Sequence, residues 1–233
     1  MSSTYDFLPG NPDNKNISRP TSFNKSINSM GYRAPEFNTI NWKESIVIFG
    51  CSHVFGKGVV DEDTISYKLE KLINRPVINM GVPASSTAFA LLNQLKMHEQ
   101  KIKPYAVINL WTCFRRLTYF HDKNILHLGP WSDRNNESDL GHIFLQKMFG
   151  LWNYNDYNAK EYTSIFYKLS NIIWEDTIKL DYSFFKDTAN LLNIKHIKGI
   201  DPGLDGGHFG ALTSIETANI IKEDLWSHLS DSN

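Results

Sequence analysis

The chain has 233 residues, of which 41% are hydrophobic and 21% charged, and its formal net charge is -1. These values are ordinary for a globular protein, and this length suits one large α/β domain. A charge near zero gives no electrostatic reason to bind nucleic acid or an anionic membrane, and no apolar run approaches the ~18 residues that cross a bilayer. Residues 1–16 lack the basic and apolar regions of a signal peptide, and two cysteines cannot form a disulfide framework, so we expect a cytoplasmic protein.

The first 41 residues are rich in Asn, Ser and Pro and show no sustained hydrophobic periodicity. Such a segment is typical of an extended arm or of partial disorder. We therefore expect an N-terminal arm over residues 1–41 and a single domain over residues 42–233. Residues 28–37 combine a glycine, an aromatic residue, an arginine and an acid, although an ordinary loop can have the same composition.

An apolar run over residues 46–49 ends at Gly50 and predicts a strand that is buried on both faces. Ser52 follows the turn that Gly50 allows, just past the carboxyl end of this strand. Ligands bind at that edge of open α/β sheets, and a hydroxyl there can act as a nucleophile if a base reaches it. The alternative interpretation is a serine that only caps the next helix.

Helices and strands alternate after this turn. The pattern predicts a helix that starts with the acidic residues and the threonine of 61–64 and reaches residue 73, a strand over 76–81, a helix over 87–100 and a strand over 105–111. This spacing implies parallel strands that are joined by right-handed crossovers. We therefore expect Ser52, Gly81 and residues 112–115 to gather at one edge of the sheet, where the strands end.

The middle of the chain, residues 117–158, interleaves aromatic residues with Asn, Asp, His and Gly. We interpret it as an insertion over the same edge, either a lid that binds substrate or a small aromatic core beneath a long loop. The remainder predicts mainly helical structure over 159–193, a short strand over 196–199 and a terminal helix over 214–229. Together these elements predict an α/β protein with a mostly parallel sheet of four to five strands, flanked by helices.

A second chemical motif lies in the glycine-rich loop of residues 201–210, just before the terminal helix. Asp205 and His208 are three residues apart there, and the glycines between them leave the backbone free to curl. An acid that contacts one imidazole nitrogen fixes the tautomer and stabilises the imidazolium. The spacing therefore makes His208 a candidate general base, although a loop of this composition is also common as a simple turn.

These motifs resemble those of the SGNH (GDSL-type) hydrolases. Residues 50–58 match the strand that ends in Gly-x-Ser and a glycine-rich turn, residues 79–83 match the glycine after the next strand, and residues 205–208 match the Asp-x-x-His before the last helix. Residues 28–36 resemble the segment that precedes the first block in one branch of these proteins. The resemblance covers residues 28 to 225 as spaced blocks and implies a three-layer flavodoxin-like fold.

Carried over residue by residue, the resemblance implies a serine esterase that needs no metal and no organic cofactor. Ser52 is then the nucleophile, His208 the base and Asp205 its orienting acid, with the backbone amides of Ser52 and Gly81 as the oxyanion hole. The substrate is then a small ester or an O-acetylated carbohydrate. Two alternatives stay open: an O-acyltransferase with the same site, and a catalytically weakened carbohydrate-binding protein on the same fold.

The chain departs from the family pattern at two places. Cys51 stands where the family has an aspartate before the serine. Residues 111–115 contain no asparagine, whereas the family has one in a Gly-x-Asn-Asp setting after the third strand. Asn109 lies inside that strand and does not match the motif position. Since the missing asparagine is an oxyanion donor in the family, we expect Thr112 or Arg115 to compensate for it.

The other potential ligand residues carry no site of their own. The eight histidines show no His-x-x-x-His spacing, so the sequence predicts no metal site. His53 neighbours the nucleophile at a tight turn and is expected to form part of the wall and not to act as a base. Cys51 and Cys113 follow neighbouring strands, and we expect two reduced, partly buried thiols.

Overall fold

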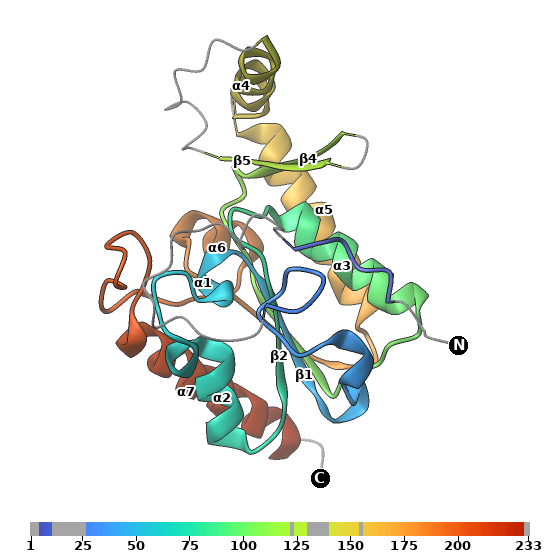
Figure 1. Cartoon of the computed structure of the whole chain (residues 1–233), viewed down its shortest axis with the longest axis vertical. Coiled ribbons are helices and arrows are strands. Elements are labelled where there is room, and N and C mark those ends of the chain that lie inside the picture. Colours follow the sequence, from blue (N-terminus) through green and yellow to red (C-terminus); the bar gives the residue numbers. More distant parts are fainter. Residues whose placement is uncertain (1–4, 11–26, 122–123, 130–139, 154–155, 231–233) are drawn as a thin grey trace.

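Five parallel strands form the central sheet in a computed structural model of the chain, in the order β2-β1-β3-β6-β7 (Figure 1). The strands are β1 (Ile46–Gly50), β2 (Val77–Gly81), β3 (Ala106–Leu110), β6 (Ile178–Ser183) and β7 (Lys195–His196). The structure describes residues 5–10, 27–121, 124–129, 140–153 and 156–230. The sheet confirms the α/β fold that the sequence predicts.

Helices cover both faces of the sheet and give a three-layer arrangement (Figure 1). One face packs against α2 (Ile65–Ile73) and α7 (Ala211–Ser230), and the other packs against α3 (Thr87–Glu99), with α5 (Tyr157–Ile173) beside it. Strand β1 shows why: Val47 and Phe49 belong to the α3 cluster, whereas Ile46 and Ile48 belong to the α2 and α7 cluster. Every residue of β1 is therefore buried, as its continuous apolar run predicts.

The strand order determines where a ligand site can form. The chain goes from β1 to β2 on one side and then crosses back to β3 on the other side of β1. This is the doubly wound order of flavodoxin-like proteins, in which ligands bind in the crevice outside the carboxyl ends of the strands where the order reverses. In this chain the reversal lies between β1 and β3, so a ligand site is expected at the segments that follow these two strands.

The prediction of mainly helical structure over 159–193 is wrong for the middle of this range. Residues 178–183 form β6, which pairs with β3 inside the sheet, and α6 (Lys186–Leu192) follows it. The sequence of β6 alternates Ile178, Leu180 and Tyr182 with polar residues, a strand period that the helical spacing on either side obscured. The other elements lie within a few residues of their predicted positions.

The N-terminal segment contributes to the core. Phe7, Tyr32, Ala34, Phe37 and Trp42 are buried in the cluster on the α3 face of the sheet. Short 3-10 helices form at Phe37–Thr39, Trp42–Glu44 and Asp61–Asp63, and the four-residue helix α1 (Ser52–Phe55) follows β1. The described residues of the predicted arm therefore pack as part of the domain.

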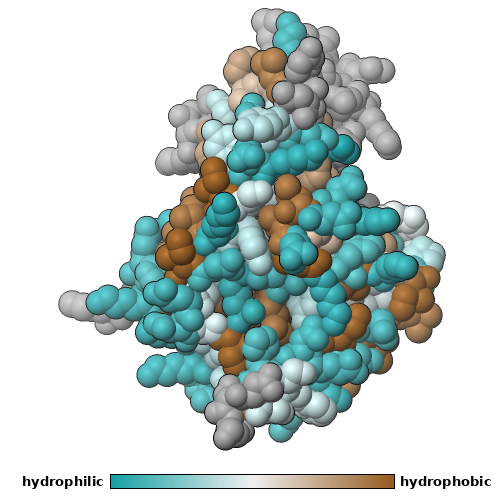
Figure 2. All heavy atoms as spheres, turned by 180° about the vertical axis from the view of Figure 1, so that it is seen from behind, coloured by the Kyte–Doolittle hydropathy of each residue, from teal (hydrophilic) through white to brown (hydrophobic). Residues whose placement is uncertain are grey.

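The aromatic insertion forms a hairpin and a projecting helix at the top of Figure 1. Strands β4 (Leu117–His121) and β5 (Asn124–Leu128) pair antiparallel, and α4 (Leu140–Asn153) leads into α5. Figure 2 shows hydrophobic patches between hydrophilic surface on the face opposite to that of Figure 1. No helix in the described ranges combines the length and the apolar character needed to cross a bilayer.

A buried polar network joins β3 and β6 to the helices. The Asn109 amide donates to Asp181 at 3.0 Å and accepts from Gln94 at 3.0 Å, and the Trp111 indole also donates to Asp181 at 2.8 Å. Lys179 forms an ion pair with the same carboxylate, and the side chain of Lys179 is only 8% exposed. Asn109 is therefore a structural residue, which agrees with leaving it out of the catalytic site.

We expect Asp181→Ala to lower the free energy of unfolding by ~3–5 kcal/mol, because it leaves the Lys179 ammonium buried without its carboxylate. Adding Lys179→Met should restore much of this loss. Urea unfolding at pH 7 measures both effects. Lys195→Met is the control, since Lys195 pairs with Asp224 while half exposed and should cost less than ~1 kcal/mol. Equal losses in Asp181→Ala and Lys195→Met would contradict the assignment.

Candidate active site

Ser52 stands at the first position of α1, directly outside the carboxyl end of β1. The helix sits close on the sheet because Gly50 and Gly81 face each other in register on β1 and β2. A Cβ at Gly50 would lie 2.4 Å from Val54 Cγ2, and one at Gly81 would lie 2.4 Å from the Phe55 amide nitrogen. The two glycines therefore make room for α1 and place Ser52, which is 5% exposed, at the edge of the crevice.

The turn after α1 fixes the backbone of Ser52. Gly56 adopts φ 81°, and the Ser52 carbonyl accepts from the Gly56 and Lys57 amides at 3.0 Å each. Ser52 also opens a helix, where amides have no partner within the helix, and its own amide makes no hydrogen bond within the described ranges. This N–H is therefore available to a ligand in the crevice.

The second part of the site is the loop of residues 201–210, which the start of α7 holds in place. The Asp201 carboxylate accepts from the amides of Leu212 and Thr213 at 3.0 and 2.8 Å, and so caps the helix. Within the loop, the Gly203 amide donates to the His208 carbonyl at 2.6 Å, and the Gly210 amide donates to the Asp201 carbonyl at 2.9 Å. The loop is thus a closed, hydrogen-bonded turn.

Asp205 and His208 form a hydrogen-bonded pair within this loop. His208 Nδ1 lies 2.7 Å from Asp205 Oδ2, and the amides of Gly207 and His208 donate to Asp205 Oδ1 at 3.1 and 3.0 Å. Partial burial opposes ionisation of Asp205, but these backbone and imidazole donors lower the pKa of the carboxyl below its ordinary value. Asp205 is therefore ionised at neutral pH and directs Nε2 of His208 away from itself.

The loop docks against the segment that follows Ser52. The Leu204 amide donates to the Gly58 carbonyl at 2.8 Å, and a Cβ at Gly58, where φ is 88°, would lie 2.8 Å from Asp205 Oδ1. The imidazole rings of His208 and His53 are 5.4 Å apart. His208 therefore lies beside the residue next to Ser52, although no hydrogen bond joins Ser52 Oγ to His208 Nε2. Such contacts are often long before substrate binds.

His53 is a neutral part of the wall. Its ring stacks on Phe209 at 4.4 Å and also contacts Phe184 and Phe185. Burial, and then the charges of His208 and Arg116, lower the pKa of His53 to about 3. His53 therefore carries no charge at neutral pH and is too weak a base to take a proton from Ser52, which fits the wall position that the sequence suggests.

The structure does not favour Gly81 as an oxyanion donor, because its amide donates to the Asn79 side chain at 2.9 Å. In the next loop, the Val82 and Ser85 amides donate to the carbonyls of Gly50 and Val82. Ala84 lies between them with φ 64°, a left-handed conformation that is strained for alanine and common at functional sites. The amide of Ala84 makes no hydrogen bond within the described ranges, so it is the free donor of this loop.

The loop after β3 presents Arg116 to the site and turns Arg115 away from it. Arg115 forms a two-point ion pair with Asp156, at 2.9 and 2.7 Å. The guanidinium of Arg116 instead lies 5.3 Å from the Phe185 ring, which His53 also contacts. Thr112 is buried at 3% exposure, and its hydroxyl is among the groups that act on the Cys51 thiol. The sequence predicts Thr112 or Arg115 as the replacement oxyanion donor, because position alone cannot distinguish Arg115 from the adjacent Arg116.

The two cysteines are free and differ in their electrostatic surroundings. Burial opposes ionisation of Cys51, but the Arg116 guanidinium and the polar groups of Thr112, His53 and Ser52 together lower the pKa of its thiol. Burial raises the pKa of Cys113. Arg116 therefore acts on the residues on either side of Ser52, and it belongs to the site although its sequence position gave no such signal.

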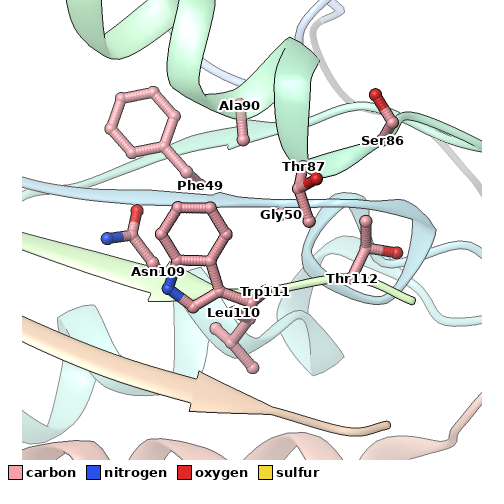
Figure 3. A pocket seen from close by; sticks show the side chains of 9 residues that line it. All are labelled: Phe49, Gly50, Ser86, Thr87, Ala90, Asn109, Leu110, Trp111 and Thr112. Carbon is pink, nitrogen blue, oxygen red and sulfur yellow. The ribbon is translucent and has the colours of Figure 1, made fainter. Parts of the chain in front are cut away.

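A small cavity lies between the ends of β1 and β3 and the first turn of α3 (Figure 3). Its volume is about 10 Å³, and its lining includes Gly50, Thr87, Trp111 and Thr112. This volume holds one water molecule at most. The cavity cannot accommodate an acyl group, so it is not a substrate-binding pocket by itself.

The described part of the chain contains no group of three or more His, Cys, Asp or Glu side chains that could hold a metal ion. The polar groups near Ser52 are one imidazole–carboxylate pair, one guanidinium and the amide of Ser52 itself. This set can deprotonate a hydroxyl and stabilise a developing negative charge.

No protein-family model and no curated protein matches the chain. Several solved structures are similar to it, including the three that follow. An acetyl xylan esterase from the rumen bacterium Butyrivibrio proteoclasticus is 9% identical with a TM-score of 0.49, over 82% of this chain and 66% of that chain. A carbohydrate esterase family 2 enzyme from Corynascus thermopiles (Myceliophthora fergusii) is 11% identical with a TM-score of 0.46, over 81% and 67%. A lipolytic G-D-S-L family protein from Veillonella parvula is 13% identical with a TM-score of 0.43, over 77% and 96%.

These structures include esterases and a member of the G-D-S-L family that the sequence motifs resemble. The chain spans about two thirds of the length of the first two. Each similarity is weak, and the α/β fold is established by the strand order of the sheet itself.

We expect the fold to lose ~2 kcal/mol at pH 5 relative to pH 7 through His53 alone. The ring stays neutral in the fold down to about pH 3 but takes a proton below pH 6.5 when the chain unfolds, so stability falls as pH falls through this window. Urea unfolding at both pH values measures the loss. His53→Phe keeps the stacking on Phe209 and should show a smaller loss. An identical pH dependence in the wild type and this variant would contradict a neutral His53.

Proposed function

We propose that the protein is a serine esterase that hydrolyses acyl esters through Ser52, His208 and Asp205. The observation that carries the proposal is the docking of the Asp205–His208 pair against the segment after Ser52, at the reversal of the strand order. Two segments that are distant in sequence, the one that begins with Ser52 and the 201–210 loop, supply a hydroxyl, an imidazole and a carboxylate. This set of groups is sufficient for nucleophilic acyl transfer.

The chemistry follows from the charges of these groups. His208 Nε2 takes the proton of Ser52 as the serine oxygen attacks the ester carbonyl, and ionised Asp205 stabilises the imidazolium through Nδ1. The tetrahedral intermediate collapses, the C–O bond to the alcohol breaks, and His208 returns the proton to the leaving alcohol. Water then attacks the acyl-enzyme by the same route and releases the acid and free Ser52.

We propose that the amides of Ser52 and Ala84, neither of which donates a hydrogen bond within the described ranges, stabilise the oxyanion in place of the Gly81 amide, which is bound to Asn79. The asparagine of the third block is missing, and in its place Arg116 provides positive charge for the oxyanion. Its guanidinium packs on Phe185 beside His53, and its charge already acts on Cys51 and His53. In a water-poor crevice, a fixed cation near the carbonyl oxygen stabilises the transition state more than the ground state.

For the substrate we propose a short-chain acyl ester, with an O-acetylated carbohydrate as the first compound to test. Phe120 and Tyr157 lie near the two ends of the insertion and have exposed rings. Such rings offer flat apolar faces of the kind that sugar rings stack on. The same acyl-enzyme could pass its acyl group to a sugar hydroxyl in place of water. Product analysis with an alcohol acceptor present separates hydrolysis from transfer.

We expect Ser52→Ala to lower the hydrolysis of p-nitrophenyl acetate by at least ~10³-fold, since it removes the nucleophile. A fluorophosphonate should label the wild type at Ser52, as peptide mass spectrometry would show. Ser45→Ala is the matched control, because Ser45 is equally buried but lies before the amino end of β1. Unchanged turnover after Ser52→Ala would contradict the mechanism, and a wild type that is inert and unlabelled would favour a binding protein.

We expect Arg116→Gln to lower kcat for the same ester by ~10²–10³-fold, the cost of losing one oxyanion donor. Arg115→Met is the matched control and should leave kcat near the wild-type value, because Arg115 is held by Asp156 at the surface. Steady-state kinetics on both variants measures the contrast. A larger loss in Arg115→Met than in Arg116→Gln would contradict the role of Arg116 and would favour Arg115.

A further inference from the structure

Arg33 lies in the N-terminal segment, and all N–H donors of its guanidinium are occupied. An arginine has five N–H donors. Nε and one N–H of Nη2 contact the Asp61 carboxylate. The two N–H groups of Nη1 reach the carbonyls of Phe55 and Gly56 at 3.2 and 2.8 Å, and Nη2 reaches the Val59 carbonyl at 3.3 Å. The pair is largely buried, with side chains 10% and 13% exposed.

The carbonyls that Arg33 binds lie at the carboxyl end of α1, the helix that Ser52 begins. These groups have no partner within a helix, and a cation there also interacts favourably with the helix dipole. Asn79 completes the arrangement, since its side-chain amide donates to the Val54 carbonyl at 2.7 Å. Side chains from two other segments therefore hold the last turn of the nucleophile's helix.

The 201–210 loop, which contains Asp205 and His208, packs against the same segment that Arg33 binds. Gly58 lies between Gly56 and Val59, and its carbonyl accepts from the Leu204 amide at 2.8 Å. Gly203 packs against the same carbonyl, and Asp205 packs against the Gly58 Cα. A chain of direct contacts thus runs from Arg33 through residues 56–59 to the Asp205–His208 pair.

Arg33 is itself held by a rigid turn. The Asn28 side chain accepts from the amides of Met30 and Tyr32 at 3.1 and 3.0 Å and donates to the Pro35 carbonyl at 3.1 Å. Tyr32, the neighbour of Arg33, is fully buried, and its hydroxyl donates to the Leu8 carbonyl and accepts from Asn93 at 2.8 Å. The Arg33 guanidinium is therefore held in place, and the backbone of residues 55–59 is hydrogen-bonded to it.

We propose that Arg33 is a positioning residue that sets the distance between Ser52 and the Asp205–His208 pair, a role that rests on the proposed esterase function. It touches neither group. Its guanidinium binds the carboxyl end of α1, the helix that Ser52 begins, and the following backbone to Val59, on which the Asp205–His208 loop packs. One side chain therefore holds both halves of the site. A displacement of about 1 Å between reacting groups can lower a rate ~10²-fold, so a residue with this position affects turnover without contacting substrate.

The test compares Arg33→Met and Arg33→Lys with Arg75→Met. Arg75 is a matched control because it also binds a carboxylate and a backbone carbonyl, both of Glu44, and stacks on Tyr105, but at the opposite end of the sheet. Fluorophosphonate titration counts active sites, so kcat can be given per site. Hydrogen exchange of peptides over residues 53–60 and 201–210 reports the attachment itself. Asp61→Asn is a milder variant in case Arg33→Met does not fold.

We expect Arg33→Met to lower kcat per titrated site ~10–100-fold with KM little changed, and to speed exchange in both peptides. Arg33→Lys, which keeps the charge but loses the planar set of donors, should recover part of kcat, and Arg75→Met should change neither measurement. A purely structural role would instead lower the number of active sites at constant kcat per site, and would overturn the proposal. Unchanged exchange over 201–210 would also overturn it, even if no esterase activity were found, because that readout does not depend on catalysis.

Discussion

The site depends on one steric constraint, the close approach of α1 to the ends of β1 and β2. Gly50 and Gly81 are partners in the parallel register, and Val54 fills the space where their side chains would be. A methyl group at Gly81 would meet the backbone nitrogen of Phe55, which cannot move without moving the helix. The position of Ser52 is therefore set by the packing of the α1 backbone against the backbones of β1 and β2. The polar contacts of the site depend on this position.

Buried or half-buried polar side chains then fix the loops around this point. Asp201 caps α7 and closes the 201–210 loop, Asn79 binds both the end of α1 and the Gly81 amide, and Arg33 binds the turn after α1. Each of these side chains binds backbone groups that regular structure leaves unpaired, which is favourable because an unpaired buried group costs free energy. The loops of the site are consequently fixed by side-chain hydrogen bonds to their backbone.

Much of this arrangement could be predicted from sequence, since apolar runs, glycine turns and helix caps are local signals. They gave the parallel strands, the edge where Ser52 lies and the Asp205–His208 pair. Strand β6 was missed because its alternation is short and lies between helical patterns. Arg116 and Ala84, the oxyanion donors that we propose, could not be predicted, because the direction of a side chain in a loop and a left-handed alanine depend on tertiary contacts. The role of Arg33 is invisible locally for the same reason, as its partners lie more than 20 residues away.

The three-residue spacing of Asp205 and His208 has a consequence for the order in which the molecule assembles. The pair closes its hydrogen bond within one turn, so the entropy lost in forming it is small and it can form early. Its contact with the segment after Ser52 joins parts of the chain near opposite ends of the domain, and such a contact costs more loop-closure entropy. The acid–base pair thus rests on local contacts, whereas its position beside the Ser52 segment rests on contacts that span most of the chain.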